Sequence, residues 1–489
     1  MKELYQLLNQ TIVYGFSSVI ARVLNFLLVP LYTMMLVPSE YAQVSEMYAY
    51  AALFMVIGSF GMETTFFRFI SNKKLNTKSV FSTAFWAIFF NAFLLFSLLG
   101  FLYKDIASII SHSNNPEYIL FFSAIIFLDL LSIIPFALLR HYNQAIRFSV
   151  LKTVNIFFNI FFNIFFLVVC PELLKHNILS PIVHIIYDPN MSVSYIFISN
   201  LIASFVTLIC LIPYFIKHLK KPNYTIFTQM ITYTWPILIA GIAFVINESA
   251  DKILIKYLLP KSINMIQLGI YSACYKLTIF LTLFTQAYRF AAEPFFFNQY
   301  KKPNAEVAYA LMMRIFILLS LAIFLFVTLY IDYIKLILRG GEAYRAGLHI
   351  IPIVLLANVF LGIYYNLSVW YKVINKTYYA AIISTIGACL TIVLNLILIP
   401  RLGYEGAAWS TLICYLSMSL ISFFLSRKHY YIPYEMNCIF KYFLVAGIIF
   451  IISLLSPQTN LVISTFLFFI YTIFTYSEIK KIINTETKH

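Results

Sequence analysis

Long apolar runs separated by short polar segments make up most of this 489-residue chain. A helix that crosses a bilayer needs about 20 mainly apolar residues. Fourteen such runs can be counted between polar or Gly/Pro-containing breaks, near residues 11–37, 44–70, 80–102, 118–139, 148–169, 193–216, 228–256, 267–292, 306–330, 346–371, 378–399, 405–426, 438–455 and 460–477. The pattern therefore predicts an all-α polytopic membrane protein with about fourteen transmembrane helices.

Composition supports this fold class. The chain is 62% hydrophobic and 11% charged, whereas a soluble protein carries roughly 25% charged residues. A net charge of +15 would suggest a nucleic-acid partner for a soluble protein. Here the basic residues fall in short loops between apolar runs, so we expect no nucleic acid as a partner. The first apolar run is also too long for the core of a cleaved signal peptide.

Cysteine and histidine give no sign of a metal or redox centre. The six cysteines are scattered and form no CxxC pair, which favours a role as small apolar residues within helices. His176 and His184 share one loop but lie eight residues apart without a further ligand. We therefore expect neither a metal site nor another cofactor.

Lysine and arginine residues divide unequally between alternate connections. One set of connections holds 18 of them and the other set holds 8. The positive-inside rule places the richer set, together with both termini, in the cytoplasm. The longest loops on the other side, near 103–117, 170–192 and 331–345, are too short for catalytic domains and carry no acid–base pair. No enzymatic activity is therefore expected.

A weak internal repeat divides the chain. Asn25 lies 13 residues before Pro38, and Asn247 lies 13 residues before Pro260. Arg68 then follows Pro38 by 30 residues, and an equivalent arginine, Arg289, follows Pro260 by 29 residues. Three anchors can coincide by chance, but a true repeat implies two six-helix lobes related by an axis along the membrane normal. The expected domains are residues 1–221, 222–428 and 429–489, the last holding two additional helices.

Polar and charged residues inside the predicted spans need a partner or a water-filled cavity, because each charge costs roughly 2.5–3.5 kcal/mol at mid-bilayer. On the first helix, a spacing of four, three, four and three residues aligns one polar stripe. The stripe consists of Thr11, Gly15, Ser18, Arg22 and Asn25. It predicts a cavity wall or, alternatively, a polar seam between two helices.

Later spans add charges of both signs. The cations within or near the spans are Arg22, Arg68, Lys252, Lys276 and Arg289, and the acids are Glu63, Asp129, Glu248, Asp251 and Glu293. Arginine and lysine in a cavity suit an anionic cargo, and unpaired acids suit coupling to H⁺ or Na⁺. Lys276 has no acid on its own helix, so its partner must lie on another helix or on the cargo.

The acids can be ranked by their neighbours along the helix. Glu248 and Lys252 are four residues apart and can pair, as can Arg289 and Glu293. This leaves Asp251, and on the fourth span Asp129, as the first candidates for ion coupling. Glu63 and Glu248 are further candidates.

The stretch FGMETTFFRFI (60–70) places Glu63 and Arg68 five residues apart, about 140° around a helix, so they do not face each other. Arg68 lies about one turn from the cytoplasmic loop and can extend its head group there. Glu63 lies deeper and needs a partner on another helix. Arg22 is the first candidate for that partner.

Four stretches of the sequence resemble a known family. They are GMETTFFRF (61–69), DLLSIIPFALLRHYNQAIRFSVLK (129–152), ADKILIKYLLP with LGIYSACYKLTIFLTLFTQAYRFAAEPFFF (250–260 and 268–297), and NLILIPRLGYEGAAWSTLICY (395–415). They are similar to the polysaccharide-export branch of the multidrug/oligosaccharidyl-lipid/polysaccharide (MOP) flippase superfamily. The resemblance covers nearly the whole chain and is weakest in the last two helices and in 171–192.

The resemblance implies a bacterial inner-membrane flippase for undecaprenyl-diphosphate-linked oligosaccharides, as in O-antigen and capsule synthesis. It implies two six-helix lobes around a central cavity that opens alternately to either side, with membrane lipid and the polysaccharide polymerase machinery as further partners. Family cavities are described as cationic. Arg22, Lys252 and Lys276 hold matching positions, whereas Arg68 and Arg289 lie nearer the cytoplasmic interface.

Three alternatives stay open at this point. A cation-coupled multidrug exporter of the same superfamily would carry cationic cargo and would need an excess of acids in its cavity. A flippase for peptidoglycan lipid precursors would share the fold. A membrane enzyme such as a polysaccharide polymerase or ligase would need a large outside loop, which the sequence lacks.

Overall fold

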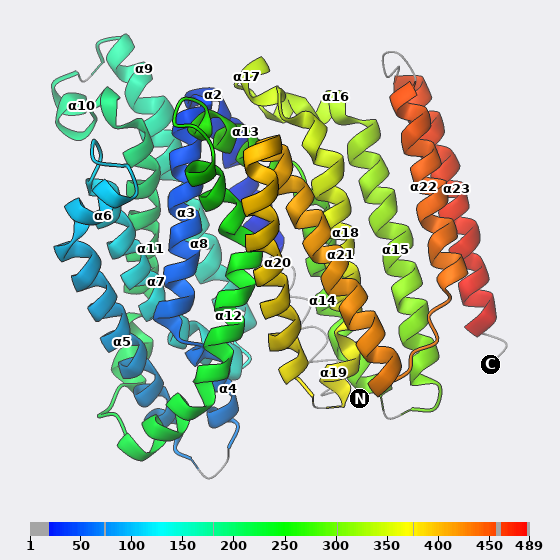
Figure 1. The fold of residues 1–489 in the computed structure, drawn as a ribbon. Coiled ribbons are helices and arrows are strands. Elements are labelled where there is room, and N and C mark those ends of the chain that lie inside the picture. The colour runs from blue at the N-terminus through cyan, green and yellow to red at the C-terminus, as the bar shows by residue number, and fades with distance from the viewer. Residues whose placement is uncertain are drawn as a thin grey trace. The chain divides into compact units, whose positions relative to one another are not determined.

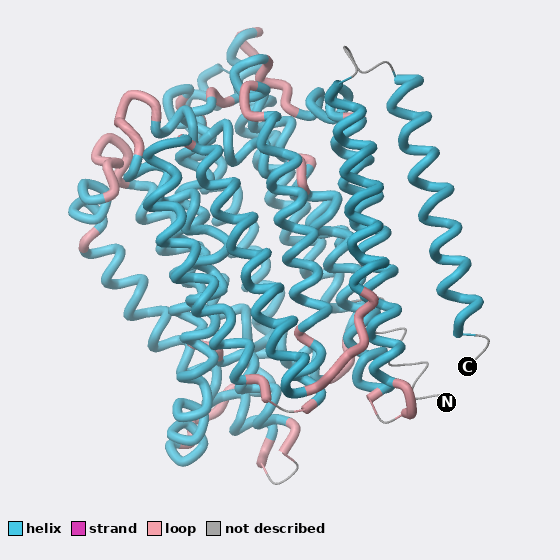
Figure 2. The backbone as a smooth tube through the Cα atoms, turned by 45° about the vertical axis from the view of Figure 1, so that its right-hand side comes forward, coloured by secondary structure: helices cyan, strands magenta, loops and turns pink. Residues whose placement is uncertain are grey.

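The computed structural model describes residues 19–72, 75–178, 180–300, 302–374, 376–455 and 461–486. Within these ranges twelve helices are long and apolar enough to cross a membrane, or thirteen if the pair α13 and α14, bent by 48°, forms one span. Short loops join the helices, and the described residues contain no strand (Figure 2). The predicted all-α polytopic fold is confirmed, and the count of fourteen spans stays a prediction.

Twelve of the fourteen predicted apolar runs coincide with these single helices, and the run 267–292 coincides with the bent pair α13 and α14. The remaining run, 11–37, is described only in part, as an apolar helix over Val19–Met35. Thr11, Gly15 and Ser18 of the predicted polar stripe lie outside the described residues, so only Arg22 and Asn25 of that stripe can be placed. Both side chains are exposed.

Contacts divide the chain into two units, one of Met1–Leu28 with Ser39–Ile253 and one of Val29–Pro38 with Leu254–His489. One boundary falls within the helix Val19–Met35, the next lies between Pro38 and Ser39, and the third falls within α12 (Tyr224–Leu258). The contact division near residue 253 does not test the sequence-based boundary at residue 221, which stays a prediction. The two six-helix lobes stay a prediction.

The first unit is built on α7 and α11. α7 packs against α5 and α11, and α11 also packs against α8 (Figure 1). The helices of this unit are α3 (Pro38–Ser59), α4 (Met62–Ile70), α5 (Thr77–Phe101), α6 (Tyr103–Ile109), α7 (Glu117–His141), α8 (Ala145–Ile164) with the π-helical turn η1 (Phe165–Val169), α9 (Cys170–Lys175), α10 (Ser180–Ile186), the 3-10 turn η2 (Pro189–Met191), α11 (Ser192–His218) and most of α12 (Tyr224–Leu258).

The second span is broken in a way that the sequence analysis did not predict. α3 ends at Ser59, and α4 begins at Met62. Between them Phe60 and Gly61 have positive φ angles of 52° and 68°. Left-handed backbone suits glycine because it has no Cβ, and a Cβ on Gly61 would lie 2.8 Å from Ile237 Cγ2 of α12. The break therefore starts a new helix at Met62, and Glu63 and Arg68 both lie on it.

The linker before α12 is held by side chains of α5. The Ser82 hydroxyl donates to the carbonyl of His218 (3.1 Å) and accepts from the Lys220 amide (2.6 Å). Thr83 accepts from the Asn223 amide, and Trp86 Nε1 donates to the Lys220 carbonyl. These bonds satisfy backbone groups that no helix can satisfy, so the start of α12 is attached to the first unit.

The second unit is centred on α18 and α21, which pack against each other, with α20 against α21 and α15 against α18. Its helices are α2 (Leu28–Met35), α13 (Asn264–Lys276), α14 (Ile279–Gln299), α15 (Ala305–Leu329), α16 (Ile331–Ile334), η3 (Lys335–Ile337), α17 (Glu342–Arg345), η4 (Leu348–Ile350), α18 (Ile351–Leu367), α19 (Val369–Val373), α20 (Tyr378–Leu402), α21 (Tyr404–His429), α22 (Met436–Leu455) and α23 (Leu461–Glu486).

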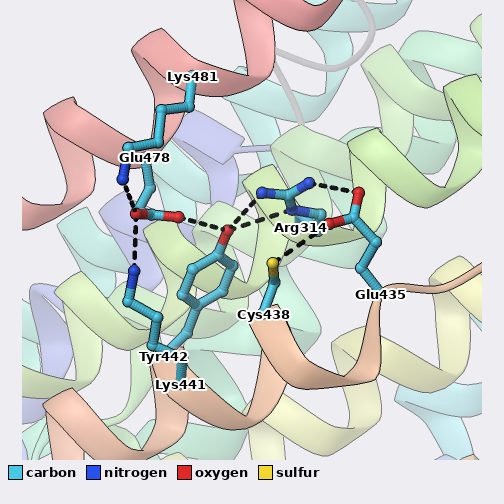
Figure 3. A network of polar contacts seen from close by, with 7 residues as sticks. All are labelled: Arg314, Glu435, Cys438, Lys441, Tyr442, Glu478 and Lys481. Atoms are coloured by element: carbon cyan, nitrogen blue, oxygen red, sulfur yellow. Dashed lines mark hydrogen bonds and ion pairs between the residues drawn. The ribbon is translucent and has the colours of Figure 1, made fainter.

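The last two helices, α22 and α23, pack against α15. A buried arginine at the centre of this contact, Arg314 of α15, bonds Glu435 (2.6 Å) and donates from Nε and Nη2 to the Tyr442 hydroxyl (3.1 and 3.0 Å). Tyr442 in turn donates to Glu478 of α23 (3.2 Å). Figure 3 shows this chain of contacts from α15 through α22 to α23. The two helices are thus joined to the second unit by polar contacts as well as by apolar packing.

Candidate functional site

Glu63 has its partner on another helix, as predicted, but that partner is Arg140 instead of Arg22. Arg140 Nη1, in the last turn of α7, lies 2.7 Å from Glu63 Oε1. The two side chains are 47% and 46% exposed. Arg22 makes no ion pair with any residue that the structure describes. Arg140 directly follows the predicted span 118–139 and is not among the charges predicted within or near the spans.

Arg68, on the same short helix, stacks on an aromatic ring of α12. Its guanidinium carbon lies 4.0 Å from the centroid of the Tyr233 ring. Arg140 lies 4.9 Å above the ring of Phe67. Contacts of this kind hold a guanidinium flat against the ring while leaving its N–H edge accessible. The guanidinium groups of both arginines are therefore held by aromatic rings, and both residues remain exposed.

Asp129 lies near the middle of α7 and is partly exposed. Lys152 of α8 interacts electrostatically with Asp129 and also with Glu63. Ser204 of α11 faces the carboxylate, yet its buried hydroxyl makes no hydrogen bond within 3.5 Å among the described atoms. Asp129 thus has polar neighbours but no ion pair to a described residue.

Lys152 is a polar residue of this region that the sequence analysis did not single out. It lies four residues inside the predicted fifth span, where a lysine ordinarily extends to the interface. In the structure its ammonium lies 4.3 Å from the centroid of the Phe136 ring, on the side of α7.

We name these five residues, Glu63, Arg68, Asp129, Arg140 and Lys152, the polar ledge of the first unit. Its three cations and two acids come from α4, α7 and α8. Its net charge is therefore +1.

On α12 the structure adds a partner for Asp251. Lys252 Nζ lies 3.1 Å from Asp251 Oδ1 and also donates to the backbone carbonyl of Glu248 at 3.1 Å. Asp251 is 4% exposed, and Asn247 is 7% exposed. The prediction that Asp251 is left over was wrong, because Lys252 turns back onto the residue that precedes it.

In the second unit, Arg289 and Glu293 of α14 form the predicted local pair, with Nη2 and Oε1 3.8 Å apart. The structure adds Lys372 of α19, whose Nζ lies 2.9 Å from the same Oε1. Lys276 is exposed and is the last residue of α13, directly before the bend at Leu277.

The comparisons with known proteins follow from this fold. A family profile described as polysaccharide biosynthesis protein matches residues 7–299, more than half of the chain. The chain belongs to this family. Its fold is that of a transporter of the MOP superfamily. A comparison of the sequence with curated proteins returns no match.

Solved structures share the fold of this polysaccharide biosynthesis protein. The lipid II flippase MurJ in an inward closed conformation matches with a TM-score of 0.68 and 16% identity, covering 96% of this chain and 99% of that chain. An inward-facing multidrug resistance MATE family transporter of the MOP superfamily matches with a TM-score of 0.66 and 12% identity, over 86% and 96% of the two chains. A mutant form of the Vibrio cholerae MATE transporter VcmN matches with a TM-score of 0.62 and 15% identity, covering 87% of this chain and 96% of that chain.

Family and fold together show a multi-pass membrane protein of the polysaccharide biosynthesis family with the fold of flippases and transporters. Among the described residues no group of three or more His, Cys, Asp or Glu side chains could hold a metal ion. In that part of the chain His176 pairs instead with Glu172, its Nε2 3.1 Å from Oε1 on an exposed surface.

Proposed function

We propose that this protein moves undecaprenyl-diphosphate-linked oligosaccharide repeat units from the cytoplasmic to the periplasmic leaflet of a bacterial inner membrane. The family description, polysaccharide biosynthesis protein, supports a cargo of this class. The fold shared with a lipid II flippase supports movement of a lipid-linked saccharide. The excess of basic residues in alternate connections supports cytoplasmic termini.

The polar ledge of the first unit is the observation that carries the proposal. Arg68 and Arg140 present guanidinium groups that are positioned by aromatic rings and remain exposed. Such groups bind phosphate through two parallel hydrogen bonds. The prenyl tail can stay in lipid, so the protein has to shelter only the diphosphate and the sugars. Arg22, Asn25, Lys252, Lys276 and Arg289 complete the proposed cargo-binding set.

Transport proceeds, on this proposal, by alternating access between two lobes. Residues 1–221 and 222–428 form the lobes, and 429–489 forms an additional helix pair. Rocking of one lobe against the other would open the cargo site to each side in turn.

A H⁺ or Na⁺ gradient is the proposed energy source, with Asp129 as the principal acid. Asp129 is preferred over Asp251 because the Asp251 carboxylate is already neutralised by Lys252. Glu63 is likewise neutralised by Arg140. Ionisable residues inside membrane-spanning segments are rare and often belong to proton or ion relays.

Complementation tests the cargo. The gene is expressed in a strain that lacks its own repeat-unit flippase, and surface polysaccharide is measured. Wild type is expected to restore export, whereas Arg140→Ala, Arg22→Ala and Lys276→Ala are expected to reduce it. Lys335→Met, in an exposed pair with Asp332, is the matched control. Normal export by all three variants would exclude a cationic cargo site, and drug resistance without export would favour the multidrug exporter.

Ion coupling has a separate test. Flipping is measured in vesicles with an imposed gradient and after its collapse by an ionophore. Asp129→Asn is expected to flip slowly and equally in both conditions, while wild type responds to the gradient. If Asp129→Asn and Asp251→Asn both keep the full gradient response, neither residue couples transport to an ion.

A further inference from the structure

A pocket in the second unit joins α14, α18 and α19. Arg289 and Glu293 of α14, Tyr365 and Asn366 of α18, and Lys372 of α19 line it. The ionisable side chains at its mouth are 42%, 43% and 30% exposed for Arg289, Glu293 and Lys372. A dissolved ligand can therefore reach them at the surface, whereas the enclosed space behind them is about 10 Å³, enough for one water.

One carboxylate oxygen lies between the two cations of the pocket. Glu293 Oε1 is 2.9 Å from Lys372 Nζ and 3.8 Å from Arg289 Nη2. The lysine comes from α19 and the arginine from α14, so two separate elements converge on one anionic oxygen. This is the arrangement expected of an anion site that an internal side chain occupies.

Arg289 is held in place without using its hydrogen-bond donors. Its guanidinium carbon lies 4.1 Å from the centroid of the Tyr365 ring. No hydrogen bond joins the guanidinium to another residue in the described part of the chain, and its contact with Glu293 at 3.8 Å is too long to be one. Because guanidinium carries five N–H donors, most of its capacity is available to a ligand.

The neutral polar groups of the pocket are already bonded to each other. Tyr288 donates to Asn366 Oδ1 at 2.6 Å, and the Asn366 amide donates to the Gly362 carbonyl at 3.1 Å. The Ser368 hydroxyl donates to the Tyr365 carbonyl at 2.6 Å. The hydrogen-bond donors that remain unused in the pocket therefore belong to the cations, which favours an anionic ligand over a neutral sugar.

We propose that this pocket binds a phosphoryl group and that Glu293 is an internal competing ligand which the phosphoryl group displaces. The net charge of the pocket is +1 with Glu293 in place and +2 once it is displaced. An external carboxylate has the same charge as Glu293. It would displace Glu293 poorly, because the covalent attachment of Glu293 keeps its carboxylate at a high effective concentration near the cations. A phosphoryl group carries up to two negative charges and three acceptor oxygens, so it displaces Glu293 more effectively.

This inference rests on the proposed function for the source of the phosphoryl group, the lipid-linked diphosphate. The same chemistry is present in free pyrophosphate and in anionic phospholipid. Binding to the purified full-length protein is therefore measured with three probes: inorganic pyrophosphate by calorimetry, and undecaprenyl phosphate and phosphatidylglycerol in nanodiscs by native mass spectrometry. Glucuronate serves as the carboxylate probe.

Two substitutions change the pocket in opposite directions. Glu293→Gln removes the internal competitor and is expected to tighten pyrophosphate binding about tenfold. This is the change expected if Glu293 leaves the two cations open in only about one-tenth of the molecules and the substitution makes the open state dominant. Lys372→Met is expected to weaken it about tenfold. Glu342→Gln, at a 90% exposed position, and Lys335→Met repeat the same charge changes outside the pocket and are expected to have no effect.

A gain of affinity in Glu293→Gln cannot arise from misfolding, so this variant keeps the test decisive. Unchanged or weaker pyrophosphate binding in Glu293→Gln would overturn the proposal, and so would glucuronate binding as tight as pyrophosphate binding. Tight binding of undecaprenyl phosphate but not phosphatidylglycerol would identify the lipid-linked source, whereas equal binding of both would overturn that assignment. A protein that binds pyrophosphate as expected but fails to complement the flippase-deficient strain would contradict only the proposed function.

Discussion

The attachment of α22 and α23 to the second unit makes a prediction whose size can be worked from the structure. Glu478 of α23 has a side chain only 4% exposed, and its Oε1 accepts from Lys441 Nζ at 2.9 Å and Lys481 Nζ at 2.8 Å (Figure 3). Its Oε2 accepts from the Tyr442 hydroxyl at 3.2 Å. One buried carboxylate is thus neutralised by two lysines, whose side chains are 48% and 65% exposed.

Removing one lysine leaves the other in place. Each exposed lysine is therefore expected to be worth only about 0.2–1 kcal/mol on its own, so Lys441→Met and Lys481→Met should each lower stability by that amount. The double substitution instead leaves a buried carboxylate without a cation, which costs about 3–5 kcal/mol. The coupling between the two sites should therefore exceed about 1 kcal/mol, well above the scatter expected for independent sites.

The assay is reversible unfolding of the purified protein in mixed micelles with increasing SDS, followed by tryptophan fluorescence. Glu478→Gln in the double-lysine background removes the unneutralised charge, so it should recover most of the lost stability. If the two lysine substitutions are additive, or if Glu478→Gln makes the double variant worse, Glu478 is solvated and the reasoning is wrong.

Two further predictions concern close contacts and exposed pairs. A Cβ on Gly269 would overlap the backbone carbonyl of Pro38, so Gly269→Ala should sharply lower the yield of folded protein in size-exclusion chromatography. A Cβ on Gly447 would meet no atom within 4 Å, so Gly447→Ala should leave that yield unchanged. The pair of Glu63 and Arg140 is nearly half exposed, so Arg140→Ala should change the unfolding free energy by less than about 1 kcal/mol. A much larger loss of unfolding free energy would show that the effect of this substitution on export is structural.

The positions of the spans could be predicted from the sequence because they depend on local apolar content. Twelve predicted runs coincide with membrane-length helices, and a thirteenth coincides with the bent pair α13 and α14. The break at Phe60 and Gly61 could not be predicted in this way, because it depends on backbone conformation and on contact with α12. FGMETTFFRFI has the same apolar content whether the helix continues or stops, and only Gly61 offers a local signal.

Pairings between helices were predicted less well than the helices themselves. Arg314 lies well inside the predicted span 306–330 but was not singled out, and its partners Glu435 and Tyr442 are more than 120 residues away along the chain. The same limit explains why Arg140 was not recognised as the partner of Glu63. A charge inside a span predicts that a partner exists, but only the packing of the helices decides which residue it is.

Burial can also overrule helical spacing between neighbours. Residues i and i+1 point to different sides of a helix, so spacing alone favours Glu248 as the partner of Lys252 and leaves Asp251 unpaired. In the structure Lys252 and Asp251 have side chains only 16% and 5% exposed, and a buried carboxylate without a cation would cost several kcal/mol. The long lysine side chain therefore bends back to Asp251. Asp129 differs from Asp251 because it is partly exposed and forms no ion pair to a described residue.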